Sequence, residues 1–145
     1  VYSGHFYYPD QFTAQGTGAK PPFTPNVHYP GFANSANWNK ATLEKAAEPL
    51  VKFQERYHVP IYIGEFSVIR WAPHDDAIHW LNDVLSIFEA HRWSWTYQTF
   101  RDWNGWSLEN DEKPPTAEQP DPPKVTYLTD RGHVIKDALA KNHTR

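Results

Sequence analysis

The protein has 145 residues, a formal net charge of −3, no cysteine, and 7 Trp, 8 Tyr and 8 Phe. This length suits one domain, and the absence of cysteine excludes a disulfide framework, a cysteine-ligated zinc site and thiol catalysis. Because the chain is mildly acidic and has no basic block, we expect no nucleic-acid partner. We expect no membrane partner either, because no apolar run approaches the roughly 20 residues that cross a bilayer.

Three segments are predicted to be β-strands. Residues 1–8 are rich in residue types that favour β-structure, and the strand should end before Pro9. Residues 59–67 are apolar at successive positions up to Gly64, which is typical of a buried parallel strand. A third strand is expected at residues 93–99.

Helical spacing of apolar residues follows each predicted strand. The first helix is expected to begin after Asn37 or Asn39, both capping residue types, and Pro49 should kink or break it. The second opens at Asp75 and Asp76 and has the clearest amphipathic stripe. That stripe consists of Ala77, Trp80, Leu81, Val84, Leu85 and Phe88.

The alternation of strands and helices predicts an α/β fold with a parallel sheet. A long loop at residues 10–38 has no clear period, and loops of this length are usually functional. A proline-rich connection at residues 110–124 precedes a short last helix, which Asp130 is expected to cap. The chain opens at Val1 without a signal peptide, and three strands leave two open edges, so we expect a processed product or a portion of a longer protein.

Reactive groups in parallel βα units lie at the C-terminal ends of the strands. Glu65 directly follows the apolar run at residues 61–64, where desolvation of a carboxylate is costly unless it has partners or a chemical role. His5 and Tyr7 lie two residues apart, so they share one side of their strand and could both reach a neighbouring carboxylate. In the alternative interpretation, Glu65 is structural and pairs with Arg70 or caps the following turn.

Three segments carry a family resemblance. Val-Tyr-Ser-Gly-His-Phe-Tyr-Tyr-Pro (1–9), Ile-Tyr-Ile-Gly-Glu-Phe-Ser (61–67) and Trp-Ser-Trp-Thr-Tyr-Gln-Thr-Phe-Arg (93–101) resemble strands six, seven and eight of glycoside hydrolase family 5 enzymes. That family includes cellulases and mannanases built on a (β/α)8 barrel. The resemblance implies that residues 1–145 are the C-terminal portion of one glycoside hydrolase TIM-barrel domain, a partial barrel of about three βα units. It also implies a secreted, extracellular protein.

By this resemblance Glu65 is the catalytic nucleophile of a retaining cellulase-like β-1,4-glycanase. His5 and Tyr7 would support it and the sugar at the cleavage site, and Trp95 would stack on that sugar. The family's acid/base glutamate and a further arginine come from strands four and two, and neither segment occurs here. Because retaining hydrolysis needs two carboxyl groups roughly 5 Å apart, we expect the isolated chain to be weakly active or inactive.

Aromatic side chains with polar rims suit sugar rings, although such rings can also simply fill a core. The residues expected to line an aromatic sugar cleft are Phe12, Trp38, Trp71, Trp95 and Trp103. A rival hypothesis from another functional class uses the same cleft without turnover, in a non-catalytic carbohydrate-binding or self-assembling half-barrel scaffold. Asp102 and Glu109 follow the third strand, where a structural or rim role is favoured.

The expected partners are a β-glucan or β-mannan oligosaccharide and another polypeptide. Three strands cannot close an eight-stranded barrel, so we expect a homo-oligomer, with a dimer favoured, or a complementing N-terminal barrel chain. The barrel-facing side of the sheet is expected to be apolar and otherwise open to water. No cofactor is expected, and a metal is disfavoured because His74 and His79 are poorly spaced for a helical pair of ligands.

Overall fold

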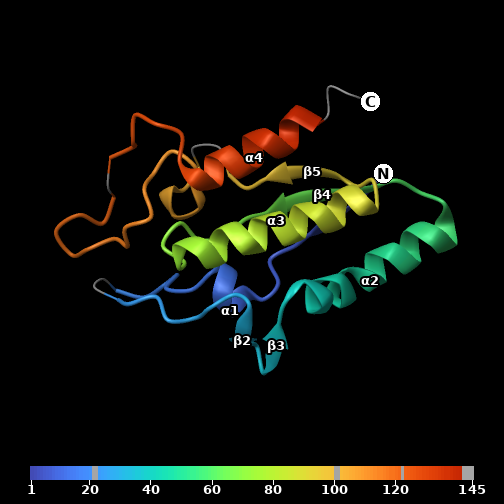
Figure 1. Ribbon diagram of the computed structural model, residues 1–145, viewed down its shortest axis with the longest axis horizontal. Helices are drawn as coiled ribbons and strands as arrows, with labels where there is room; N and C mark the ends of the chain where they lie inside the picture. The colour runs from blue at the N-terminus through green and yellow to red at the C-terminus, as the bar shows by residue number, and fades with distance from the viewer. Residues whose placement is uncertain (21–22, 100–101, 122, 142–145) are drawn as a thin grey trace.

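The computed structural model describes residues 1–20, 23–99, 102–121 and 123–141 (Figure 1). Phe100 and Arg101, the last residues of the segment 93–101 that carries the family resemblance, and Pro122 of the proline-rich connection lie outside the described residues. The elements in chain order are β1 (Tyr2–His5), α1 (Asp10–Thr13), β2 (Gly31–Ala33), β3 (Ala36–Trp38), α2 (Lys40–Tyr57), β4 (Ile61–Phe66), α3 (His74–Ala90), β5 (Ser94–Tyr97), the 3-10 helix η1 (Asn104–Trp106) and α4 (Asp130–Ala140). The α/β fold predicted from the sequence is confirmed.

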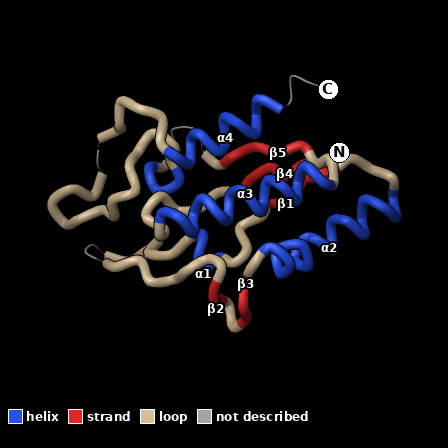
Figure 2. The backbone as a smooth tube through the Cα atoms, in the orientation of Figure 1, coloured by secondary structure: helices blue, strands red, loops and turns tan. Residues whose placement is uncertain are grey.

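The main sheet of the described residues has the strand order β1-β4-β5, and both pairings are parallel. Parallel neighbours need a long crossover, and here α2 connects β1 to β4 while α3 connects β4 to β5. Figures 1 and 2 show α3 lying across the sheet with α2 and α4 on its two sides, and α3 contacts both of these helices. This arrangement makes β4 the central strand.

The two faces of the sheet differ in polarity. Tyr62 pairs with Ser3 on one side and Ser94 on the other, so these side chains share the face that the helices leave open. The hydroxyls of Tyr62 and Thr96 hydrogen-bond on this face. Ile63, the next residue, is fully buried on the helix side. The expected apolar barrel-facing surface is therefore wrong, because the open face carries small and hydroxyl-bearing side chains.

The core lies between the sheet and α3. All six residues of the predicted α3 stripe are buried, as the helical spacing required. Phe66 at the end of β4 is fully buried and meets the rings of Phe88, Trp95 and Tyr97 edge-on, with centroids 5.2 to 5.6 Å apart. Trp80 is also fully buried, and its indole N–H donates to the carbonyl of Tyr8 at 2.8 Å.

Helix boundaries decide two open alternatives and correct one expected cap. Asn39, and not Asn37, caps α2 by accepting a hydrogen bond from the Thr42 amide. Pro49 does not break α2, which runs through it with the proline ring exposed. Thr129 caps α4 in place of Asp130, because the threonine hydroxyl accepts from the Gly132 amide at 3.1 Å.

The long loop at residues 10–38 contains structure that the sequence pattern did not predict. It forms α1 and an antiparallel hairpin of β2 and β3. Asn34 and Ser35 both adopt positive φ at the hairpin turn, as a type I′ turn requires. The backbone N–H of Asn34 donates to the side-chain oxygen of Gln11, and the backbone N–H of Gln11 donates to the side-chain oxygen of Asn34. These two hydrogen bonds hold the hairpin against α1.

None of the helices in the described part of the chain combines the length and apolarity that a bilayer crossing needs. The same residues contain no set of three or more His, Asp or Glu side chains arranged to hold a metal ion.

Candidate active site around Glu65

The pairing of β1 with β4 is irregular at the position of Glu65. Gly4 pairs with Ile63, but the next residue of β1, His5, pairs with Glu65, so Gly64 is an extra residue on β4. Simple alternation would place Glu65 on the same face as the buried Ile63. The bulge instead turns Glu65 to the face of His5, as bulges beside functional sites often do.

His5 at the end of β1 and Tyr7 two residues beyond it both contact one oxygen of Glu65. The Tyr7 hydroxyl donates to Glu65 Oε2 at 2.9 Å, and His5 Nδ1 lies 3.4 Å from the same oxygen. Burial, and then the hydrogen bond to Glu65 and its charge, raise the pKa of Tyr7 well above its ordinary value, so the phenol remains a donor at physiological pH. The structure thus brings together the three residues predicted to be catalytic, while their roles remain a proposal.

The alternative pairing of Glu65 with Arg70 does not occur. The fully buried Arg70 guanidinium donates to the carbonyl oxygens of Asp111 and Lys113 and to the side chain of Asn104. Burial lowers the pKa of Arg70, although the nearby Asp111 carboxylate opposes this effect. Arg70 therefore stabilises the loop after β5, and the contacts of Glu65 are with Tyr7 and His5.

Trp106 is a site residue that the sequence reasoning missed. Its indole stacks on the Tyr7 ring with centroids 5.4 Å apart and planes 30° apart. Its carbonyl accepts from the Tyr97 hydroxyl at 3.0 Å, which ties η1 to the end of β5. The signal available in the sequence was the Trp103 and Trp106 pair shortly after the third strand, since loops after strands carry the functional groups of βα folds.

Two of the predicted sugar-binding aromatics are core residues. Phe12 is fully buried and packs against Tyr29 with ring centroids 5.8 Å apart. Trp71 is only 4% exposed, and its indole N–H donates to the Gln15 carbonyl at 2.8 Å. The prediction that these rings line a sugar cleft is wrong, because packing from the loop at residues 10–38 covers them.

Trp95 lies on the wrong face of the sheet for its predicted role. It pairs with the buried Ile63, so its side chain is directed toward the helices. Its indole N–H donates to Glu89 of α3 at 3.3 Å, and its ring packs edge-on against Phe66. The expectation that Trp95 stacks on a sugar beside Glu65 is therefore corrected.

Trp38 and Trp103 also keep accessible surface. Trp38 is half-buried and stacks on the half-exposed Tyr8 with planes 4° apart. Trp103 is 38% exposed and meets Trp106 edge-on at 5.2 Å. Trp95 is also half-buried, but it lies on the helix side of the sheet, away from Glu65.

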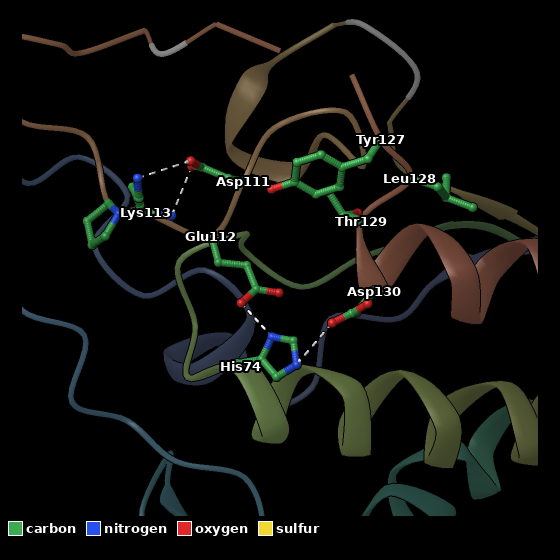
Figure 3. Close-up of a pocket in the computed structure, with 9 residues that line it drawn as sticks. His74, Asp111, Glu112, Lys113, Tyr127, Leu128, Thr129 and Asp130 are labelled. Atoms are coloured by element: carbon green, nitrogen blue, oxygen red, sulfur yellow. Dashed lines mark hydrogen bonds and ion pairs between the residues drawn. The ribbon is translucent and has the colours of Figure 1, made fainter. Parts of the chain in front are cut away.

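A cavity of about 570 Å³ lies away from Glu65, between the start of α3, the loop at residues 111–114 and the start of α4 (Figure 3). His74 bridges its walls: Nδ1 lies 2.5 Å from Glu112 Oε2, and Nε2 lies 3.4 Å from Asp130 Oδ2. The hydrogen bond to Glu112 and the charges of Glu112, Asp130 and Asp75 raise the pKa of His74, and partial burial opposes them. We interpret this cluster as a structural clasp that joins α3, the loop and α4.

The clasp predicts a pH-dependent contribution to stability. Because the folded-state pKa of His74 is raised above 6.5, its stabilisation is present in full below pH 6.5 and is lost as the pH rises through the folded-state pKa. Since the side chain is 44% exposed, we expect His74→Asn to lower the free energy of unfolding by only about 0.5 kcal/mol at pH 6 and by less at pH 9.

Urea unfolding of both proteins across this pH range tests the prediction, with His79→Asn as the control for loss of an exposed histidine from the same helix. A difference between wild type and His74→Asn that grows from pH 6 to pH 9 would contradict it.

Comparison with known proteins relates the chain to glycoside hydrolases, although no family model matches it. It is 28% identical over 144 residues to Endoglucanase C of Acetivibrio thermocellus, and the alignment covers 82% of this chain and 41% of that protein. The chain is partially homologous to endoglucanases. The chain therefore spans about two-fifths of the length of this relative.

Solved structures agree with this relationship. A glycoside hydrolase crystal structure superposes with a TM-score of 0.71 at 26% identity, covering 97% of this chain and 40% of the other. Endoglucanase Cel5A from Thermotoga maritima gives a TM-score of 0.60 at 26% identity, covering 76% and 34%. The small parallel sheet with its helices thus aligns with about two-fifths of a TIM-barrel glycoside hydrolase.

Proposed function

We propose that this chain carries the nucleophile half of the active site of a retaining β-1,4-glycanase of glycoside hydrolase family 5, and corresponds to strands six to eight of the barrel. The observation that supports this most directly is Glu65 at the end of the central strand, turned by a bulge toward His5 and held by Tyr7. The partial homology to endoglucanases supports the same reaction class.

Glu65 is suited to nucleophilic attack because both of its polar neighbours contact the same carboxylate oxygen. Tyr7 and His5 lie against Oε2, and no described residue forms a hydrogen bond with Oε1. In the proposed reaction Oε1 forms a bond to the anomeric carbon while the glycosidic C–O bond breaks and the leaving oxygen takes a proton from the acid/base. Water, deprotonated by the same acid/base, then cleaves the glycosyl-enzyme bond and releases Glu65.

The acid/base carboxyl group is proposed to come from another polypeptide segment. Retaining hydrolysis requires two carboxyl groups roughly 5 Å apart. By the family resemblance, the second one follows strand four, outside the part of the barrel that this chain resembles. Asp102 is exposed and Glu109 accepts from Lys124 at 2.8 Å, in keeping with roles at the rim.

The proposed substrate is a β-linked glucan or mannan. Structures of Thermotoga maritima Cel5A include complexes with mannotriose and with cellobiose. A secreted location, implied by the family resemblance, is part of the proposal. The rival function, a non-catalytic carbohydrate-binding or scaffold half-barrel, is favoured by the accessible rings of Trp38 and Trp103 and would not require Glu65.

An activity assay on a soluble β-1,4-glucan tests the proposal. The chain alone should show little or no turnover, because loss of proton assistance typically costs on the order of 10² to 10⁴ in rate. Mixing it with the part of Endoglucanase C that precedes the matched region should restore turnover. Glu65→Gln should then abolish that turnover, while Glu48→Gln on the exposed side of α2 should not.

Three results distinguish the alternatives. Turnover of about 1 to 10³ per second by the chain alone, lost in Glu65→Gln, would show that a carboxylate of this chain supplies the acid/base. Turnover that survives Glu65→Gln would remove the nucleophile assignment. Oligosaccharide binding without turnover in every mixture would favour the carbohydrate-binding or scaffold function.

The strand edges support association with another chain. β1 and β5 are the outer strands of the described sheet, and neither contains the lysine that commonly protects an edge. We expect light scattering at micromolar concentration to detect a homo-oligomer, with a dimer favoured, or a complex with the complementing barrel segment. A monomer that unfolds cooperatively and does not bind that segment would contradict this expectation.

A further inference from the structure

A polar hollow of about 360 Å³ opens in the loop after β5, beside Trp103. The groups that matter for recognition are the indole of Trp103, the carboxylates of Asp102 and Asp121 and the amide of Asn104. This volume lies at the lower end of the range for small-molecule sites. The lining combines one aromatic ring with hydrogen-bonding groups.

The Trp103 ring is held in place by its neighbours. It lies so close to Gly105 that a Cβ at that position would come within 2.3 Å of the indole, so the contact requires glycine. Trp71 and Trp106 meet the ring edge-on, with centroids 6.0 and 5.2 Å away. The indole therefore keeps a defined orientation although 38% of the residue is exposed.

Hydrogen bonds from a buried arginine orient the polar side chains of the hollow. Buried Arg70 donates from Nε and Nη2 to Asn104 Oδ1, each at 3.4 Å. Because the amide oxygen faces Arg70, the amide nitrogen is directed to Asp121 and donates to its Oδ1 at 2.7 Å. The carboxylate of Asp121 is thereby positioned beside the indole, and the exposed Asp102 adds further acceptor oxygens.

We propose that this hollow binds one neutral hexopyranose unit of the oligosaccharide substrate, as a subsite remote from the cleaved bond. An aromatic face stacks on the C–H face of a pyranose, while carboxylate oxygens accept hydrogen bonds from its hydroxyls. Lys124 also lines the hollow, but its ammonium is paired with Glu109 at 2.8 Å, so the carboxylates of Asp102 and Asp121 disfavour an anionic sugar. The described residues offer no metal-binding group of three acidic or histidine side chains. The proposal rests on the proposed glycanase function.

Ring contacts connect the hollow to Glu65. Trp103 meets Trp106 at 5.2 Å, Trp106 stacks on Tyr7 at 5.4 Å, and Tyr7 donates to Glu65. An oligosaccharide long enough to contact both Trp103 and the neighbourhood of Glu65 should bind more tightly than a short one. Chain-length selectivity is therefore the property that the hollow would confer.

Calorimetric titration of the full chain with cellotetraose and mannotetraose tests the proposal. Binding of at least one of them should weaken about tenfold in Trp103→Ala and in Asp121→Asn. Trp103→Phe should restore affinity to within about threefold of wild type, since it keeps an aromatic ring. Tyr57→Ala, at an exposed aromatic on α2, is the matched control and should leave affinity unchanged.

Two results would overturn the subsite. One is an affinity that neither Trp103→Ala nor Asp121→Asn changes, in variants whose unfolding transitions match wild type. The other is the absence of any tetrasaccharide binding.

The titration is repeated in Glu65→Gln, which should bind as wild type does. Turnover of the mixture with the complementing segment of Endoglucanase C is measured in parallel. If Glu65→Gln abolishes that turnover while the Trp103 variants bind as wild type does, only the subsite is removed. If the mixture keeps its turnover with Glu65→Gln while the Trp103 variants bind more weakly, only the nucleophile assignment is removed.

Discussion

Replacing Phe66 with alanine is expected to lower the free energy of unfolding by about 3 to 5 kcal/mol. Phe66 is fully buried, and the rings of Phe88, Trp95 and Tyr97 pack edge-on around it. These neighbours belong to the sheet and to α3, so they cannot collapse into the cavity without shifting whole elements. Urea or guanidinium unfolding, followed by circular dichroism, measures the change.

The matched control is Phe32→Ala, because Phe32 is 69% exposed in β2. That substitution should change the free energy of unfolding by no more than about 0.5 kcal/mol. A loss below about 1 kcal/mol for Phe66→Ala would mean that the core between β4 and α3 is looser than the ring contacts indicate.

Replacing Arg70 with methionine is expected to lower the free energy of unfolding by about 3 to 5 kcal/mol. The substitution would leave the carbonyls of Asp111 and Lys113 without their buried donor and would release Asn104. Because the loop carrying Trp103 would lose its support, the near-ultraviolet circular dichroism of the tryptophans should weaken as well.

Arg56→Met is the control for this prediction, since Arg56 is exposed and lies over the Tyr57 ring at 5.4 Å. Its effect should stay below about 1 kcal/mol, the usual range for an exposed cation over an aromatic ring. An equal effect of both substitutions would show that the buried network of Arg70 does not stabilise the loop.

Local pattern in the sequence predicted the α/β class and the clearest helix. The α3 stripe follows from helical spacing, and every residue of that stripe is buried. The apolar run before Glu65 located the central strand and the end of it that carries Glu65. Such features depend on neighbours within a few residues along the chain, so periodicity records them.

The hairpin within residues 10–38 shows where local pattern stops being informative. Its turn uses Asn34 and Ser35 at positive φ, whereas the strong sequence signature of such turns ends in glycine. Its attachment to α1 through Gln11 depends on residues 23 positions away. Without a turn signature or a period, the segment resembled an unstructured loop.

The face of the sheet on which Glu65 lies was decided only by the tertiary structure. Alternation along β4 points Glu65 into the core, and it is the pairing with β1 that introduces the bulge and turns it toward His5. Its partner Tyr7 lies 58 positions away along the chain. The sequence alone also did not show that three aromatic residues expected to bind sugar are turned into the protein. Packing buries Phe12 and Trp71, and Trp95 is directed toward α3.

The sequence by itself therefore determined which elements form and which carboxylate ends the central strand. Register and long-range packing decided which side chains meet there, because these depend on contacts between residues remote in the chain.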